Sequence, residues 1–491
     1  MTNDRKTPIE ISNKEFKEIG YRLIDEIADF TGNIGNKPVT KGETPSQIQK
    51  ILGNASLPEN GRSPNELVSQ TTQLLFEHSL FNGHPKFFGY ITASASPIGA
   101  LADLLAATVN PNVGAQILSP IATEIEKQTV SWLAEIIGVS PGYGGILVSG
   151  GNMANFTAFL AARTEKASSE FKENGIDKGL ERLLVYCSIT THTWVEKAAV
   201  LFGHGSKSVR WIETDENNKM DMIALKKAID NDLQAGHKPF MVVGTAGDVS
   251  TGTVDNLAAI ADVCKRYDLW FHVDGAYGVP AAIVPEMKSI FNGLDEADSI
   301  AIDPHKWLYN PLEAGCTLIK NPTHLTNTFS HQPAYYNFSN TEEEVFQNYH
   351  EFGLQNSRGF RALKVWLTIQ QVGRSGYIEM IGDDIRLAKL LFTLAQNEPE
   401  LEAVTHNLSI TTLRYIPENF ADDNEYLDSL NEALLNKLQK EGEVFLSNAI
   451  VEGKYCLRAC IVNFRTSEKD IEEVIQIILR EGAKVHGLIT N

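Results

Sequence analysis

The chain has 491 residues, an ordinary hydrophobic fraction of 43% and a net charge of −19 at neutral pH. This length predicts two or three domains, and the acidic balance argues against nucleic acid and anionic membranes as partners. No apolar signal core or membrane-spanning stretch is present, so we expect a cytoplasmic protein. Its five cysteines are too scattered for a disulfide framework, and we expect no metal site.

The first predicted element is an amphipathic helix over residues 15–30, where apolar residues recur at helical spacing. A helical arm outside the main domain must bury its apolar face somewhere, and another subunit is a reasonable candidate. A Gly- and Asn-rich loop follows over 31–44. Two further helices are predicted over 98–109 and 121–137.

Continuous apolar strands then alternate with helical patterns, such as those over 154–163 and 257–266. This alternation predicts a mostly parallel sheet that is covered by helices on both faces. A smaller α/β segment follows Gly376 and ends in a helix over 468–482. The five predicted strands are 146–148, 183–186, 240–243, 269–273 and 300–302.

The stretch SIAIDPHKW places Lys306 just after the strand over 300–302. Active sites of open α/β sheets lie at the carboxyl ends of strands. A partly desolvated lysine there loses its proton more easily and can form a Schiff base with a carbonyl compound. A lysine after a core strand is more often an ordinary surface residue, so its interpretation depends on the other strand ends.

Three other strand ends carry polar or small residues. Gly150 and Gly151 precede a helix whose free N–H groups suit an anion, although this signal is weak by itself. His192 follows the second strand and could equally be an ordinary loop histidine. Asp274 ends a buried strand, where a carboxylate is costly unless it meets a cation or a donor. Together with Lys306, these parts are what a phosphorylated pyridine aldehyde requires.

With these strand ends and the motifs around them, the chain resembles the pyridoxal-phosphate-dependent group II amino-acid decarboxylases, most closely their aromatic-L-amino-acid branch. The resemblance implies the type I, aspartate-aminotransferase-like α/β fold with a mostly parallel seven-stranded sheet. It implies a helical arm (1–96), a large cofactor-binding domain (97–376) and a small C-terminal α/β domain (377–491). The motifs that carry it are HPKFFGYITAS, SPIATEIE, SGGNMANFTAFLAAR, THTWVEKAA, HVDGAYG, DPHKW and SRGFRALKVW.

The resemblance also implies a role for each matching residue. Lys306 would hold pyridoxal 5′-phosphate as a Schiff base, and Asp274 would keep the ring nitrogen protonated so that the ring accepts electrons. His192 and Ala276 would lie against the two faces of the ring. The remaining cofactor contacts would be Gly151, Asn152, Asp303 and His305, and the substrate side would include Tyr90, Thr92 and His305.

A further implied role is that of a tyrosine on a mobile loop, which reaches across a homodimer to return a proton to the substrate. Counting back without gaps from SRGFRALKVW places Tyr349 at this position, within an acidic, irregular segment over 338–352. Tyr349 could also be an ordinary loop aromatic. We predict a homodimer whose active site lies at the subunit interface.

Three departures from the family pattern bear on the substrate. Asp248 and Val249 stand where many relatives carry threonines, so no contacts are assigned to them. Asn152 replaces a commoner serine but can still hydrogen-bond phosphate. Asn112 and Gly114 replace an apolar residue and a phenylalanine of the aromatic branch, and a glycine there predicts a roomier pocket.

The expected reaction is decarboxylation of an L-amino acid, aromatic in type (tryptophan, phenylalanine, tyrosine or a related one), to the amine and carbon dioxide. An oxygen-dependent aromatic aldehyde synthase is the nearest alternative, but that branch typically replaces the loop tyrosine or the stacking histidine. A non-aromatic substrate such as glutamate would require an added cation, which the sequence does not locate. A non-catalytic scaffold protein would usually lose Lys306 or Asp274, and both are present.

Overall fold

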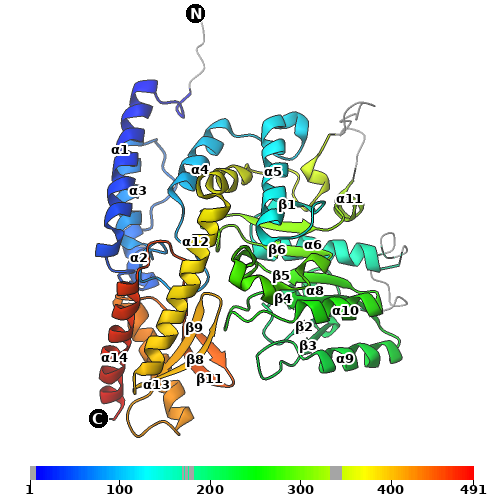
Figure 1. Cartoon of the computed structure of the whole chain (residues 1–491). Coiled ribbons are helices and arrows are strands. Elements are labelled where there is room, and N and C mark those ends of the chain that lie inside the picture. Colours follow the sequence, from blue (N-terminus) through cyan, green and yellow to red (C-terminus); the bar gives the residue numbers. More distant parts are fainter. Residues whose placement is uncertain (1–6, 169–170, 172–174, 176–181, 332–345, 491) are drawn as a thin grey trace, which may run out of the picture.

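Two β-sheets organise the chain, a large one that follows the N-terminal helices and a small one near the C-terminus (Figure 1). The computed structural model describes residues 7–168, 171, 175, 182–331 and 346–490. Most of the segment predicted to be mobile, over 338–352, therefore lies outside the described residues. Among the described residues, no helix is both long and apolar enough to cross a membrane.

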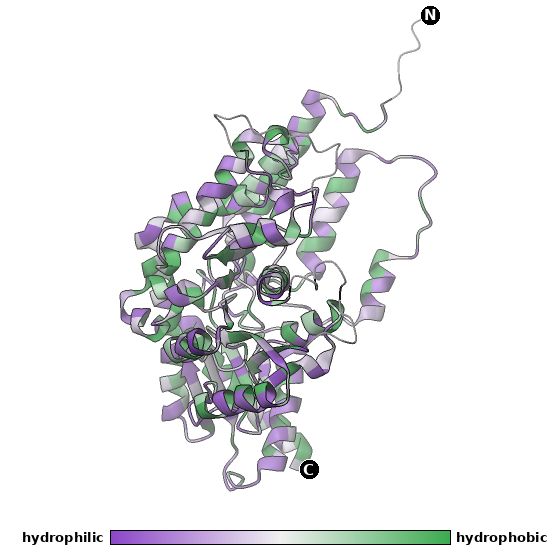
Figure 2. Cartoon of the chain, turned by 90° about the vertical axis from the view of Figure 1, so that its right-hand side faces the viewer, coloured by the Kyte–Doolittle hydropathy of each residue, from purple (hydrophilic) through white to green (hydrophobic). Residues whose placement is uncertain are grey.

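The N-terminal arm is helical, as predicted. Its first helix is capped by the Ser12 hydroxyl, which accepts a hydrogen bond from the backbone of Glu15. Figure 2 shows green and purple segments alternating along the helices, as expected for elements with one apolar face. The helices that precede the large sheet are α1 (Asn13–Asn33), η1 (Ile34–Asn36), α2 (Pro45–Leu52), α3 (Pro64–His78), α4 (Pro97–Val109), η2 (Gln116–Leu118) and α5 (Pro120–Ile137).

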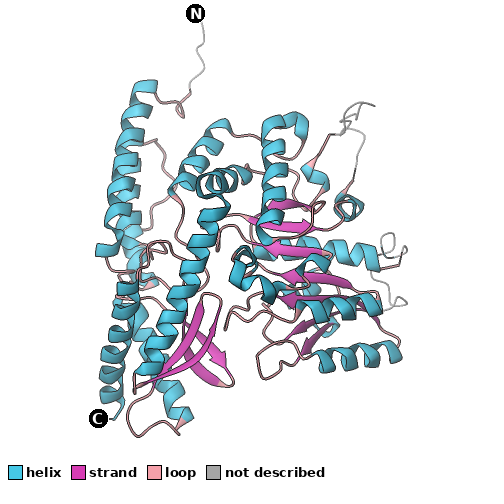
Figure 3. Ribbon diagram, viewed as in Figure 1, coloured by secondary structure: helices cyan, strands magenta, loops and turns pink. Residues whose placement is uncertain are grey.

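The large sheet has seven strands in the order β1-β7-β6-β5-β4-β2-β3. Neighbouring strands are parallel from β3 through β2, β4 and β5 to β6, whereas β7 runs antiparallel to both of its neighbours, β6 and β1. The prediction of a mostly parallel sheet is therefore confirmed (Figure 3). The strands are β1 (Gly144–Val148), β2 (Leu183–Ser188), β3 (Val209–Ile212), β4 (Lys238–Thr245), β5 (Trp270–Asp274), β6 (Ser299–Ile302) and β7 (Gly315–Ile319).

Helices cover both faces of this sheet. Along β2, Leu184 and Tyr186 join one buried apolar cluster, while Val185 and Cys187 join another on the opposite face. A strand buried on both sides reads as a continuous apolar run, which is why these strands were visible in the sequence. The covering elements are α6 (Gly151–Lys166), α8 (Trp194–Leu201), η3 (Ser206–Ser208), α9 (Met222–Gln234), α10 (Leu257–Tyr267), η4 (Val279–Ile283), η5 (Pro285–Phe291), η6 (Leu294–Glu296), α11 (Thr323–Phe329) and η7 (Tyr349–Glu351).

Helix α12 (Ala362–Asn397) connects the two sheets: it packs on α4 and α5 near its start and on β8 and β9 near its end. Its backbone leaves the helical conformation at Gly373 (φ 66°, ψ 172°), close to the predicted domain boundary at 376. The small antiparallel sheet has the order β10-β11-β9-β8. Its elements are β8 (Leu401–Asn407), β9 (Ile410–Tyr415), α13 (Asn424–Glu441), β10 (Ser447–Val451), β11 (Lys454–Cys460) and α14 (Glu468–Thr490).

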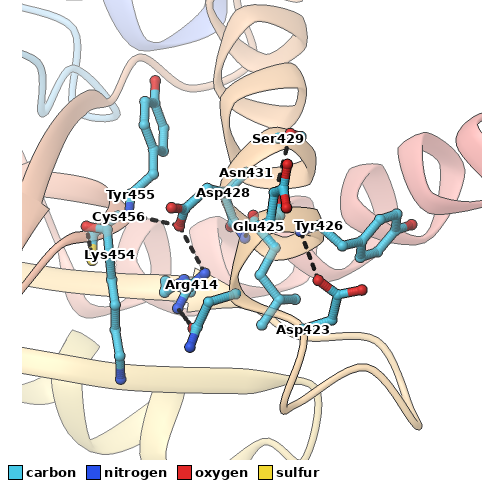
Figure 4. Close-up of polar contacts among 12 residues, drawn as sticks. Arg414, Asp423, Glu425, Tyr426, Asp428, Ser429, Asn431, Lys454, Tyr455 and Cys456 are labelled. Carbon is cyan, nitrogen blue, oxygen red and sulfur yellow. Dashed lines mark hydrogen bonds and ion pairs between the residues drawn. The ribbon is translucent and has the colours of Figure 1, made fainter.

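A fully buried arginine ties β9 to α13 in the small domain (Figure 4). The guanidinium of Arg414 donates to Asp428 Oδ1 at 2.9 Å and to Asn424 Oδ1 at 3.1 Å. Glu402 lies 3.6 Å away on β8. Asp428 also accepts a hydrogen bond from the backbone N–H of Tyr455, so one carboxylate links three elements of this domain.

We expect Arg414→Met to lower the free energy of unfolding by about 2–3 kcal/mol, as followed by urea denaturation. Removing one partner of a fully buried pair costs about 3–5 kcal/mol, but Asp428 and Glu402 remain partly solvated once the cation is gone. Arg386→Met is the matched control, because Arg386 makes ion pairs on the surface. Such pairs contribute about 0–1 kcal/mol, and equal losses in both variants would contradict the prediction.

Candidate active site

The carboxyl ends of β1, β2, β4, β5 and β6 meet around one cavity of about 310 Å³. It brings together every predicted site residue except His305 and Tyr349. The lining residues are Tyr90, Ile91, Thr92, Gly151, Asn152, Asn155, His192, Thr245, Gly247, Asp248, Val249, Asp274, Ala276, Tyr277, Asp303 and Lys306.

Lys306 lies in a turn directly after β6, where its backbone N–H donates to the carbonyl of Asp303 at 2.8 Å. Its Nζ lies 3.1 Å from Oδ2 of the same aspartate. The other oxygen, Asp303 Oδ1, is buried and has no hydrogen-bond partner among the described residues. A buried carboxylate oxygen without a donor is costly, so this side of the cavity is suited to a ligand that brings a proton or a cation.

The residues that flank Lys306 are fixed by a carboxylate on α12. Asp384 Oδ2 accepts hydrogen bonds from Trp307 Nε1 at 2.9 Å and from the Tyr309 hydroxyl at 2.5 Å. The Trp307 ring also stacks on Tyr277, with ring centroids 5.0 Å apart. The lysine therefore projects from a turn whose next residues are anchored in the core. Sequence reasoning missed Asp384, because an acid within a long amphipathic helix normally faces solvent.

Asp274 is buried at the end of β5 and receives a hydrogen bond on Oδ2 from the indole N–H of Trp194, at 2.7 Å. Its Oδ1 has only a long contact of 3.3 Å with the backbone N–H of Ala276, and is available to a ligand in the cavity. The Trp194 ring meets His272 edge to face, and burial lowers the pKa of His272 to about 4. Trp194 was also missed, although a tryptophan in the polar motif THTWVEKAA signals an indole in need of an acceptor.

His192 and Ala276 both line the cavity beside this carboxylate. The backbone N–H of Trp194 donates to His192 Nδ1 at 3.2 Å, which fixes the orientation of the ring. Burial lowers the pKa of His192, although the nearby Asp274 charge opposes the shift. The imidazole is therefore neutral near pH 7, which suits contact with a flat ring.

The turn before α6 is the one predicted to bind an anion. Gly150 has φ 145°, a conformation that favours glycine, and no side chain caps the helix, so its first N–H groups are free. A β-carbon on Gly151 would lie 2.7 Å from Asp303 Oδ2, so only glycine fits. The side chain of His305 is largely buried and lines the space of about 550 Å³ in front of this turn, and burial lowers the pKa of its imidazole.

These residues fit pyridoxal phosphate. The start of α6 is suited to its phosphate, Asp274 to its ring nitrogen, and the space between small and flat side chains to its ring. The amine of Lys306 could hold its aldehyde, with the carboxylate of Asp303 close to that amine.

The turn TAGDVSTG is organised by Asp248. Its carboxylate accepts hydrogen bonds from the backbone N–H groups of Ser250, Thr251 and Thr253 at 2.8–2.9 Å. These hydrogen bonds hold the turn in one conformation, so the aspartate has a structural role within the turn. Val249 is 40% exposed and lines the cavity beside it.

Tyr349 lies outside the cavity of its own chain. Its side chain is 1% exposed among residues of β1, α5 and α6, and its hydroxyl has no hydrogen-bond partner among the described residues. The guanidinium of Arg358 lies 4.8 Å from the centre of the ring. Arg358 in turn forms a buried ion pair with Glu126.

Gly114 lies beside the segment that carries Tyr349, since its carbonyl accepts a hydrogen bond from the backbone N–H of His350. The absence of a side chain at this position is explained by nearby backbone. A β-carbon there would lie 2.3 Å from the carbonyl oxygen of Asn356. Asn112 accepts hydrogen bonds from the backbone N–H groups of Gly114 and Arg358. Close backbone packing within one chain therefore accounts for the glycine that sequence reasoning connected with a roomier pocket.

Comparison with known proteins adds independent information. Residues 45–414 match the pyridoxal-dependent decarboxylase conserved domain. The aromatic-L-amino-acid decarboxylase of Bacillus atrophaeus is 34% identical over 473 residues, which are 96% of each chain. A phenylacetaldehyde synthase of Arabidopsis thaliana is 27% identical over 96% of this chain and 97% of that one. The crystal structure of Oryza sativa TDC with PLP and tryptamine matches with a TM-score of 0.90 at 26% identity, covering 98% of this chain and 99% of that one.

The buried position of Asp384 predicts a pH-dependent contribution to stability. Burial raises its pKa from 3.8 to about 7, despite the hydrogen bonds from Tyr309 and Trp307. The folded chain thus keeps a proton that the unfolded chain loses, so this contribution is full below about pH 4 and is lost as the pH rises through 7. We therefore compare the free energies of unfolding of Asp384→Asn and the wild type. Their difference should shift in favour of the variant by about 3–4 kcal/mol as the pH rises from 4 to 8.

Urea unfolding of both proteins at several pH values measures this difference. Asp383→Asn is the matched control, because the neighbouring Asp383 is exposed and pairs with Arg386 on the surface. If the difference in free energy of unfolding between the wild type and Asp384→Asn does not change with pH, the prediction is contradicted.

Proposed function

The chain belongs to the pyridoxal-dependent decarboxylase family, and we propose that its substrate is an aromatic L-amino acid, which it converts to the amine and carbon dioxide. It is a carboxy-lyase that uses pyridoxal phosphate. The observation that carries the proposal is that Lys306 and Asp274 share one cavity beside an uncapped helix start. The aromatic class is supported by relatives named for aromatic amino acids or crystallised with tryptamine.

Each side chain of the cavity has a distinct task. When bound, pyridoxal phosphate supplies a protonated ring that takes up the electron pair left as the carboxyl group departs. Asp274 would hold the proton on the ring nitrogen through Oδ1, because Trp194 occupies Oδ2 and fixes the carboxylate. Lys306 would hold the cofactor covalently, and its amine would be freed when the amino group of the substrate takes its place. Asp303 Oδ2 forms an ion pair with the lysine, 3.1 Å from Nζ.

The substrate side of the cavity is formed by Tyr90 and Thr92, with His305 beyond them. Tyr90 adopts a left-handed conformation (φ 51°), which is uncommon for a residue with a side chain. Its backbone N–H donates to Ser447 Oγ at 2.5 Å, which anchors this strained residue to the small domain. The tyrosine ring is 60% exposed at the cavity and is placed to cover an incoming substrate.

The proposal includes a cytoplasmic homodimer. Apolar side chains on α4, η2 and α5 are between about half and three-quarters exposed, and exposure of this many apolar side chains is typical of a subunit interface. A protein that is monomeric in solution would contradict this part. All five cysteines are buried and unpaired, which suits a reducing compartment. The exposed residues of the patch are Leu101, Leu104, Leu105, Val109, Ile117, Leu118 and Ile121.

Tyr349 is proposed to return the proton to the substrate of the partner subunit. Its hydroxyl is buried without a partner, which costs about 1–3 kcal/mol, so the position described here is energetically poor for a tyrosine. This cost offsets part of the stabilisation that burial of the ring supplies in the position described here. The acidic segment before it lies outside the described residues.

An aromatic aldehyde synthase is the second candidate, because the relatives include a phenylacetaldehyde synthase. In the family resemblance, that branch typically lacks either the loop tyrosine or the stacking histidine. Both Tyr349 and His192 are present in this chain, which favours release of the amine. Formation of aldehyde and hydrogen peroxide instead of amine would reverse this choice.

The wild-type enzyme should release carbon dioxide and amine from at least one of tryptophan, tyrosine and phenylalanine, and more slowly from glutamate and histidine. Lys306→Ala should abolish turnover and the visible absorbance of bound pyridoxal phosphate, because no other amine in the cavity can hold the aldehyde. The measurements are amine analysis by chromatography and an absorption spectrum. A Lys306→Ala variant that is still active would refute the central assignment.

Tyr349→Phe should have two opposite effects. Loss of the unsatisfied hydroxyl should raise the free energy of unfolding by about 1 kcal/mol, while loss of a proton donor should lower amine formation by about 100-fold or more. Tyr415→Phe is the matched control, because its buried hydroxyl donates to Glu400 at 2.9 Å and lies in the small domain. That variant should be less stable than the wild type and fully active, and a fully active Tyr349→Phe would remove the catalytic role.

A further inference from the structure

A row of buried polar side chains lies between the large sheet and α6 and ends at the active-site cavity. Each member is at most 2% exposed, and the last one, Asn155, lines the cavity. Polar groups buried this deeply are costly unless they have partners, so each donor in the row must meet an acceptor. The members, in the order of their hydrogen bonds, are Trp270, Ser299, His272 and Asn155.

The hydrogen bonds of this row have one direction. The indole N–H of Trp270 can only donate, and Ser299 Oγ accepts it at 2.8 Å. The hydroxyl of Ser299 then donates to His272 Nδ1, 2.8 Å away, which is its only acceptor among the described residues. Burial lowers the pKa of His272 to about 4, so the ring is neutral and carries its single hydrogen on Nε2. Nε2 donates this hydrogen to Asn155 Oδ1 at 2.7 Å.

This direction identifies the free atom of the Asn155 amide. Because Oδ1 accepts the imidazole N–H, the nitrogen Nδ2 points away from His272. In the part of the chain that the structure describes, Nδ2 donates no hydrogen bond, and it is not among the atoms buried without a partner. Since the whole residue is 2% exposed and lines the cavity, this accessible nitrogen opens into the cavity.

The free nitrogen belongs to the side of the cavity that suits a phosphate. Asn155 follows Gly151 by one helical turn, so both residues lie on the same face of α6. Side chains of a helix lean toward its start, which directs the amide toward the uncapped N–H groups near Gly151. In pyridoxal phosphate the protonated ring nitrogen is a donor and requires an acceptor such as Asp274, whereas the phosphate oxygens accept. The phenolic oxygen is separated from the phosphate arm by the aldehyde carbon, so a donor on α6 meets the phosphate first.

We propose that Asn155 is a further cofactor-binding residue whose amide donates a hydrogen bond to the phosphate of pyridoxal phosphate, and that His272 is the positioning residue that orients this amide. The amide adds a side-chain donor to the backbone N–H groups at the start of α6. The role concerns retention of the cofactor and does not depend on which amino acid is decarboxylated.

Two replacements of Asn155 separate this role from a structural one. Asn155→Asp keeps an acceptor for the His272 N–H but turns an oxygen toward the phosphate, whereas Asn155→Ala removes both groups. The full chain, stripped of cofactor, is titrated with pyridoxal phosphate at about pH 8, where carboxylates are ionised, and binding is followed by absorbance. The Kd should rise by about 10-fold in Asn155→Ala, as expected for loss of a hydrogen bond to a charged group. In Asn155→Asp it should rise by more than about 100-fold, because like charges then face each other.

An amide that only receives the imidazole N–H predicts the opposite order, with Asn155→Asp the milder change, and that result would overturn the proposal. Pyridoxal, which lacks the phosphate, identifies the group in contact: its Kd should change by less than about 3-fold in both variants. Equal losses of affinity for the two ligands would place the contact on the ring and would overturn the phosphate assignment.

The positioning role of His272 is tested in the same titration. His272→Phe should weaken binding of pyridoxal phosphate about as much as Asn155→Ala does, because the amide loses its donor and can turn. His272→Gln can still donate an N–H and should keep most of the affinity. Equal Kd values for the two variants would remove the positioning role.

Asn431→Asp is the matched control, because its amide is buried in the small domain and both of its polar atoms bind the backbones of Tyr415 and Leu427. This variant should unfold at a lower urea concentration but bind pyridoxal phosphate as the wild type does. A loss of affinity as large as that in Asn155→Asp would show that general destabilisation weakens binding, and the proposal would fail. If cofactor affinity depends on Asn155 but no amine is released from any aromatic amino acid, the proposed reaction fails and the binding role stands.

Discussion

The two hydrogen bonds accepted by Asp384 are the constraint on which the geometry of the active site depends. They hold Trp307 and Tyr309 in the core, and Lys306 precedes both in the same turn. A flexible amine on a loose loop would lose much of its reactivity, because a Schiff base forms only when the nitrogen is held near the carbonyl carbon. The anchor comes from α12, the helix that also packs against the small sheet. The small domain is therefore structurally part of the site through this helix.

A second constraint acts at the neighbouring strand end. Trp194 supplies a donor to one oxygen of Asp274 and leaves the other with only a long contact from the backbone. The two anchors use the same kind of contact, a hydrogen bond from a core aromatic side chain to a buried carboxylate. At Asp274 the indole of Trp194 orients the carboxylate. At Asp384 the carboxylate orients the indole of Trp307 and the phenol of Tyr309. Because both pairs are buried, their hydrogen bonds exclude water and keep the groups in one geometry. The catalytic residues need few contacts of their own when their neighbours are fixed in this way.

The sequence predicted the large sheet and most of the cavity, because buried parallel strands are continuous apolar runs that end in polar residues. It did not predict β3 or β7: β3 is short and only partly buried, so it is no continuous apolar run, and β7 joins the sheet antiparallel. Asp384 was invisible for a different reason. Its significance arises from partners far away in the chain, and no local spacing records that. The functional roles of the site residues remain predictions, whereas their common location is now a structural fact.

The distance along the chain between Lys306 and its anchor has a consequence for biosynthesis. Trp307 and Tyr309 precede Asp384 by 77 and 75 residues, and a ribosome adds about 5–20 residues per second. The strands around the lysine are thus complete for about 4–15 s before the carboxylate that fixes it has been made. During that interval the nascent chain carries an unanchored lysine, and a cofactor captured then would be held loosely. Firm retention of the cofactor must wait until α12 has left the ribosome and folded against the sheet.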